Sequence, residues 1–217
     1  MTTPEETKPE FPYLLASGAH GVDSDDCCLL EACSIPVGTL PAPGVDRTDR
    51  PPDVCSVRAA FGRSLNDSYG RGDAADLERT RDLWPLVETL RGTAARKDGQ
   101  RVSLYLVDRT FRDWYPRSLA LYAKALRAVA HKSGALEVRC LECAGLIDTI
   151  VGRLRGLAPI TDVGSAALAA LADLAARAAR AALAGDPALA EEIRTTGREL
   201  RREMAAALLE TCQSDWK

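Results

Sequence analysis

Histidine is scarce in this chain of 217 residues, which has only His20 and His131. A cysteine hydrolase needs a base beside its thiol, and neither histidine stands in a recognisable catalytic motif. Phosphate-binding loops and the sequences GxSxG and HExxH are also missing. The chain therefore lacks the usual signatures of P-loop nucleotide binding, serine hydrolysis and zinc proteolysis.

Long apolar runs are missing as well. No segment has the roughly 18 uninterrupted apolar residues of a membrane-spanning helix, and the first residues, MTTPEETKPEFPY, do not resemble a signal peptide. We therefore expect a cytoplasmic protein with no membrane partner. Its seven cysteines, an odd number at irregular spacing, should then stay reduced and form no disulfide framework.

An excess of positive charge is also absent, because 31 acidic residues outnumber 28 basic ones. The arginines near the C-terminus alternate with glutamates, which is typical of a solvated helix face with ion pairs. They are Arg194, Arg198, Arg201 and Arg202, interleaved with Glu191, Glu192, Glu199 and Glu203. Nucleic acid is therefore not expected as a partner.

What the chain does have is apolar residues at helical spacing, which predicts an all-α fold. The expected helices cover residues 27–33, 53–66, 74–90, 101–115, 116–131 and 137–156. A long proline-rich loop, residues 36–52, separates the first two. Pro85 should bend or restart the third helix. In the fourth, Val102, Leu104 and Leu106 alternate as in a β-strand, but the later apolar residues favour a helix. In the helix expected at residues 137–156, the apolar stripe consists of Val138, Leu141, Ala144 or Gly145, Ile147, Ile150 and Leu154.

The C-terminal part predicts a long antiparallel helical hairpin. An alanine-rich helix should run from about residue 162 to Ala184, where Gly185 ends it, and a second should begin at Pro187 after the Asp186 cap. We expect a mobile N-terminal tail (residues 1–24) in which Phe11, Tyr13, Leu14 and Leu15 contact the body. The helical body (25–156) and the packed hairpin (157–217) should together form one domain.

Cys28, Glu31 and Asp49 are the candidates for a catalytic or small-ligand site. Cys28 stands near a helix N-terminus, where the dipole could lower the pKa of its thiol, although the acidic pair Asp25 and Asp26 opposes a thiolate. Each candidate also has a structural interpretation. Cys28 could simply pack, Glu31 could be solvated or pair with Arg58 or Arg63, and Asp49 could be a turn residue. Asp53, beside them in the sequence, would cap a helix.

Cys140 and Cys143 form a CxxC pair and are the candidates for a metal site. Together with Cys27, Cys28, Cys33 or Cys55 they could in principle bind zinc. Within a continuous helix the same spacing also suits core packing, and no second CxxC or HxxxH completes four ligands. We expect packing, with no cofactor and no metal.

Two segments, CCLLEACSIPVG and TDRPPDVCSVRAAFGRSLND, together with LRGLAPITDVGSAALAALADLAARAARAA, resemble an uncharacterised helical family of actinobacteria and their phages. The resemblance implies a short helix, a proline-containing loop, a second helix and an alanine-rich C-terminal region. It brings no established activity. Where relatives are expected to have a histidine in an SDHP-like turn, this chain has Arg50.

We therefore expect a non-enzymatic protein-interaction or self-association module, with the hairpin as one route to self-association. The alternatives are a hydrolase or small-ligand-binding protein that uses Cys28, Glu31 and Asp49, and a structural zinc protein that uses the clustered cysteines.

Overall fold

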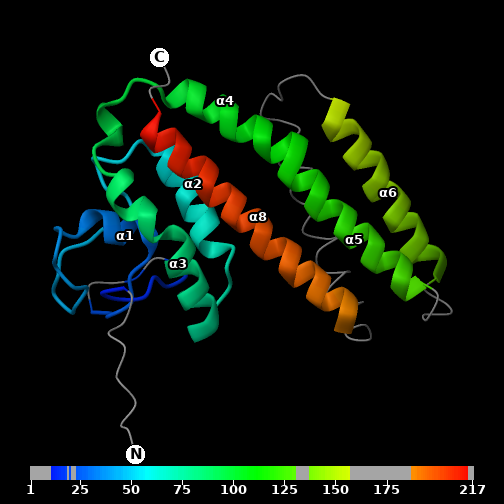
Figure 1. The fold of residues 1–217 in the computed structure, drawn as a ribbon, viewed down its shortest axis with the longest axis horizontal. Coiled ribbons are helices and arrows are strands. Elements are labelled where there is room, and N and C mark those ends of the chain that lie inside the picture. Colours follow the sequence, from blue (N-terminus) through cyan, green and yellow to red (C-terminus); the bar gives the residue numbers. More distant parts are fainter. Residues whose placement is uncertain (1–10, 19, 21–22, 131–136, 157–186, 215–217) are drawn as a thin grey trace, which may run out of the picture. The chain divides into compact units, whose positions relative to one another are not determined.

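The computed structural model describes residues 11–18, 20, 23–130, 137–156 and 187–214. These residues are mostly helical and include no β-strand, so the coarse prediction of an all-α protein is confirmed (Figure 1). None of the described helices is both long enough and apolar enough to cross a membrane.

The helices follow one another in the order α1 (Leu29–Ser34), α2 (Ser56–Asp67), α3 (Asp73–Thr89), the 3-10 turn η1 (Thr93–Ala95), α4 (Gly99–Arg109), the π-helical turn η2 (Thr110–Trp114), α5 (Tyr115–Ala130), α6 (Glu137–Gly156) and α8 (Pro187–Gln213). Residues 101–115 are thus helical and not a strand. Helix α3 continues through Pro85. The π-turn precedes Pro116, which has no N–H to donate to the carbonyl of Arg112, so the helical ladder adjusts there.

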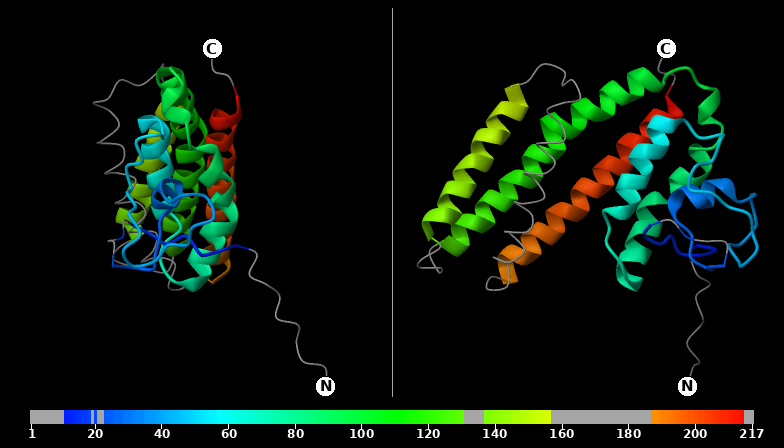
Figure 2. Two further views of the ribbon diagram at one scale, coloured as in Figure 1. Left: turned by 90° about the vertical axis from the view of Figure 1, so that its left-hand side faces the viewer. Right: turned by 180° about the vertical axis from the view of Figure 1, so that it is seen from behind.

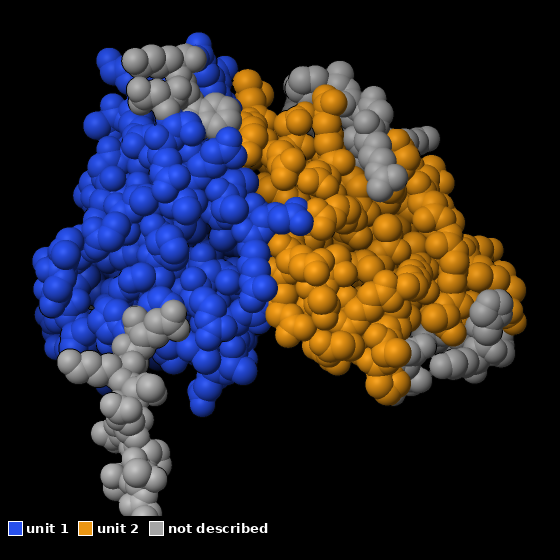
Figure 3. Space-filling model, viewed as in Figure 1, with its two compact units in different colours: residues 1–102, 201–217 blue, residues 103–200 orange. Residues whose placement is uncertain are grey.

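The chain divides into two compact units, shown in separate colours in Figure 3. Unit 1 comprises Met1–Val102 and Arg201–Lys217, and unit 2 comprises Ser103–Leu200. The single domain expected from the sequence, with a tail at residues 1–24, a body at 25–156 and a packed hairpin at 157–217, stays a prediction.

Unit 1 is built around α1, which lies against both α2 and α3 (Figures 1 and 2). Its core contains Leu29, Leu30, Leu83, Leu86 and Leu208, all essentially inaccessible to solvent. The N-terminal segment joins this core, since Leu15 is buried and bridges to Cys27, while the rings of Phe11 and Tyr13 contact Trp84 at centroid distances of 5.7 and 5.1 Å.

Two buried arginines, Arg58 and Arg79, form hydrogen bonds that connect distant segments of unit 1. The Arg58 guanidinium donates to both carboxylate oxygens of Asp98 (2.9 and 2.7 Å) and also to Thr211. Arg79 donates to the carbonyls of Asn66 (2.9 Å) and Leu15 (2.8 Å). These bonds satisfy buried polar groups that no regular structure would otherwise pair.

Unit 2 is built from α5 and α6, which lie side by side and antiparallel (Figures 1 and 2). Their shared core consists of Leu119, Ala123, Leu126, Ala144, Ile147 and Val151. The expected inward stripe of α6 is right in part, because Ala144 and Ile147 are buried, whereas Val138 and Leu141 are 65% and 41% exposed. Helix α6 is apolar on two faces, so periodicity alone could not select the buried one.

Helix α8 begins at Pro187, as its proline predicts, and buries Leu189, Leu200 and Leu208. The first arm of the predicted hairpin lies outside the described residues. Asp53 does not cap α2, because that helix begins at Ser56 after Cys55. Instead the Asp53 carbonyl accepts the N–H of Ala94 (2.9 Å).

Candidate functional site

Glu31 is a buried anchor of the α1 N-terminus. Its carboxylate, 1% exposed, accepts the backbone N–H of Cys28 (2.9 Å) and that of His20 (2.7 Å). A carboxylate at this position both caps the helix and interacts favourably with its dipole. Glu31 therefore has neither of its expected structural roles, since it is not solvated and does not bind Arg58 or Arg63.

Cys28 is almost fully buried directly before α1. Burial raises the pKa of its thiol to about 12, and the negative charge of Glu31 acts in the same direction. The thiol therefore keeps its proton at neutral pH, despite its place beside a helix N-terminus. A protonated thiol is a poor nucleophile and a poor metal ligand.

Cys28 and Asp49 line the same small cavity in unit 1, together with Gly18, Arg63, Asn66 and Asp67. Asp49 is held there by Arg63, whose guanidinium donates to its carbonyl (2.6 Å) and lies 3.4 Å from its carboxylate. The cavity volume is about 30 Å³, enough for one or two water-sized groups but not for a substrate. Glu31 does not line this cavity, although its carboxylate accepts the backbone N–H of Cys28, so Cys28 is near both other candidates.

Sequence reasoning missed Asn66, which is 2% exposed beside this cavity. Its amide donates to the carbonyl of Ala16 (3.0 Å) and accepts the N–H of Leu29 (3.3 Å), so it joins three segments. An asparagine near the end of a helix usually signals a cap or a turn, and nothing in the local pattern reveals such long-range partners.

The CxxC cysteines lie on α6 in unit 2. Cys140 is half-buried and packs against the α5/α6 core, whereas Cys143 is exposed. Within the described part of the chain, no three His, Cys, Asp or Glu side chains gather in a way that could hold a metal ion.

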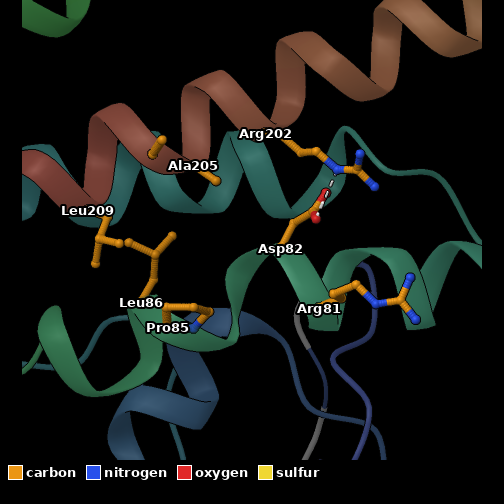
Figure 4. A pocket seen from close by; sticks show the side chains of 8 residues that line it. Arg81, Asp82, Pro85, Leu86, Arg202, Ala205 and Leu209 are labelled. Carbon is orange, nitrogen blue, oxygen red and sulfur yellow. Dashed lines mark hydrogen bonds and ion pairs between the residues drawn. The ribbon is translucent and has the colours of Figure 1, made fainter. Parts of the chain in front are cut away.

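A larger concavity lies between α3 and the C-terminal part of α8, both within unit 1 (Figure 4). We call it the α3/α8 groove, and its volume is about 280 Å³. Its apolar part consists of Pro85, Leu86, Ala205, Ala206 and Leu209, and its polar end consists of Arg81, Asp82 and Arg202.

The four arginines of α8 differ in their ion-pair partners. Arg194 and Arg198 pair with Glu191 of their own helix, as expected for a solvated face. Arg201 and Arg202 instead cross to α3, where they pair with Glu78 and Asp82, each at 3.3 Å. The sequence contains no local signal for these cross-helix pairs.

The chain was compared with protein-family models, curated proteins and solved structures, and no match was found in any of the three. The resemblance to the actinobacterial family therefore stays a prediction, and function has to be inferred from these sites alone.

Proposed function

We propose that this chain is a non-enzymatic protein-interaction module and that the α3/α8 groove receives apolar side chains of a protein partner. The observation that carries the proposal is an apolar groove between two helices, with charged groups confined to one end. Grooves of this kind bind the anchor residues of a peptide or an amphipathic helix.

The groove is at the lower size limit of a metabolite site and is large enough for side chains of a peptide. Small-molecule sites usually occupy about 300–1,000 Å³, and the groove, at about 280 Å³, falls just below that range. Two or three aliphatic side chains would fill it. The rest of such a partner would lie along the surfaces of α3 and α8.

The rival proposal is a hydrolase or small-ligand site at Cys28, Glu31 and Asp49. Three features weigh against it: the Cys28 thiol keeps its proton, Glu31 is occupied by two backbone N–H groups, and the cavity is too small for a substrate. Broad activity profiling tests this rival. Turnover that Cys28→Ala abolishes would overturn the interaction proposal.

A defined selection tests the groove directly. A random library of 12-residue peptides would be selected on the immobilised full chain and counter-selected on Ala206→Trp, which fills the groove from an exposed position. Ala60→Trp, at an exposed position on α2, is the matched control. We expect enriched peptides to bind the wild type and Ala60→Trp but not Ala206→Trp. Equal binding to all three proteins would contradict the proposal.

Self-association is a second form of this function, and the outer face of α6 favours it. That face exposes Val138, Leu141 and Leu146, the last at 64%. Exposed apolar patches often mark protein contacts. Sedimentation equilibrium should then show a dimer that Leu146→Glu dissociates, whereas a wild-type monomer at all concentrations would exclude this form. The hairpin route expected from the sequence involves residues that the structure does not describe.

A further inference from the structure

We infer that the partner segment bound by the α3/α8 groove carries a carboxylate one helical turn from its apolar anchor. This inference rests on the proposed function and specifies the chemistry of the partner. It follows from the charges at the polar end of the groove and from their order along the two helices.

Asp82, the carboxylate at the polar end, already has two hydrogen-bond donors within the chain. Asp82, 7% exposed, accepts a hydrogen bond from the Tyr69 hydroxyl (3.1 Å) and another from Arg202 (3.3 Å; Figure 4). Burial raises the pKa of Tyr69 above its ordinary value, so its hydroxyl stays protonated and can donate. Two donors fix the Asp82 carboxylate in place, and this in turn orients Arg202.

Arg81 differs from Arg202 in having no such partner. It is exposed, lines the same groove, and makes no hydrogen bond or ion pair with any residue of the described chain. The described residues at the polar end therefore comprise two guanidinium groups and one carboxylate, and only Arg202 is paired with that carboxylate (Figure 4). Guanidinium groups bind carboxylates in planar, often bidentate geometry.

The positions of these residues also set the spacing of the partner's groups. Arg81 and Arg202 each precede an apolar groove residue, Pro85 and Ala206, by four positions on their own helices. One turn of a helix rises about 5–6 Å, so the charged end and the apolar part are about that far apart. A helical partner would match this distance with an acidic residue three or four positions from an aliphatic one.

A carboxylate suits the groove better than the phosphates of a nucleic acid. Among the described residues at this end only one positive charge, that of Arg81, has no paired carboxylate, and the nearby carboxylates of Glu78 and Asp82 would repel phosphates. A sugar-phosphate chain would also make no use of the apolar part of the groove. A preference for nucleic acid is nevertheless measurable, and it is one outcome of the test.

The test sequences the peptides enriched on the wild type and measures their affinity by fluorescence anisotropy. We expect Asp or Glu three or four positions from Leu, Ile or Val. The best peptide would be synthesised with Glu and, as its twin, with Lys at that position. The Glu peptide should bind about threefold to tenfold more tightly than the Lys peptide, with the difference shrinking as salt is raised.

Charge-reversal variants locate the effect. Arg81→Glu should invert the preference between the two peptides, whereas Arg71→Glu, the same charge change at an exposed position outside the groove, should preserve it. Arg81→Lys should keep the preference in weaker form because it retains the charge but not the planar donor pair.

The possible failures are distinguishable. Groove-dependent peptides without acidic residues, or equal binding of the Glu and Lys peptides, would overturn this inference and leave the proposed function standing. Tighter binding of a 12-nucleotide single strand than of any peptide would overturn it in favour of nucleic acid. If no peptide discriminates the wild type from Ala206→Trp, the proposed function fails and the inference fails with it.

Discussion

The interiors of the two units differ in the kind of contact that stabilises them. All the polar and charged residues buried in the described structure belong to unit 1: Glu31, Arg47, Arg58, Asn66, Arg79, Thr80, Thr93, Asp98 and Thr211. The described core of unit 2 is apolar, and its ion pairs, such as Lys124 with Glu192, lie at the surface.

The difference follows from how much of each unit is helical. A helix pairs most of its own backbone groups, so α5 and α6 need only apolar stripes to associate. Unit 1 contains long irregular segments, including the stretch between Ser34 and Ser56. Their carbonyls and N–H groups need partners, and buried side chains such as Arg79 and Asn66 supply them. Loop-rich structure thus depends on particular polar residues, whereas a helical pair tolerates many apolar ones.

Thiol labelling should show the largest contrast between the units. We expect the exposed Cys143 to react with an aromatic disulfide reagent at pH 8 at least about a thousandfold faster than the buried thiols of unit 1. Those thiols are Cys27, Cys28, Cys33, Cys55 and Cys212. Burial raises the pKa of Cys27 and of Cys28 to about 12, which slows their reaction further. Rapid loss of two or more thiols in Cys143→Ser would contradict the contrast.

Removing a buried charge from unit 1 should cost the most stability. Arg58→Ala would leave Asp98 without its two charge-assisted hydrogen bonds, and we expect the free energy of unfolding in urea to fall by about 3–5 kcal/mol. The double variant Arg58→Ala with Asp98→Ala should lose less than the two single losses combined. A single-variant loss below about 1 kcal/mol would mean that the buried pair has little effect on stability.

Neighbouring residues on opposite faces of α6 provide the matching test in unit 2. Ile147, 5% exposed, lies in the α5/α6 core, and Leu146 lies outside it. Ile147→Ala should lower the free energy of unfolding by about 2–4 kcal/mol, because it removes buried methyl groups and leaves a cavity. Leu146→Ala should change it by about 0.5 kcal/mol or less. Similar losses in both variants would show that the outer face of α6 is also covered in solution.

Acid should weaken unit 1 through Asp98. The hydrogen bonds from Arg58 hold the pKa of this carboxyl below its ordinary value of 3.8, so its stabilising effect is complete above that value. The effect is lost as the pH falls through the lowered pKa of the folded state. We expect the stability difference between the wild type and Asp98→Asn to be constant above about pH 5 and to shrink below about pH 4. A difference that does not change down to pH 2 would contradict this assignment.

The prediction of elements from sequence succeeded where apolar spacing and terminal residues agreed. Pro187 marked the start of α8, and Leu83, Leu86 and Val87, which lie at helical spacing in α3, are buried, whereas Leu77 of the same series is 42% exposed. It failed for Val138 and Leu141 in α6, where both faces are apolar, and at Asp53, whose carboxylate was expected to cap α2. Both failures involve a choice between options that the local sequence allows equally.

The amino-acid sequence by itself determined the helical class, most helix boundaries and many of the buried leucines, because these depend on contacts within a few residues along the chain. Only the tertiary structure decided what the polar residues do. It turned Glu31 into a helix anchor, kept the Cys28 thiol protonated, and placed Arg81, Asp82 and Arg202 at one end of an apolar groove. The side chains of α3 and α8 that form this groove are more than a hundred residues apart, and their pairing depends on packing that no local periodicity encodes.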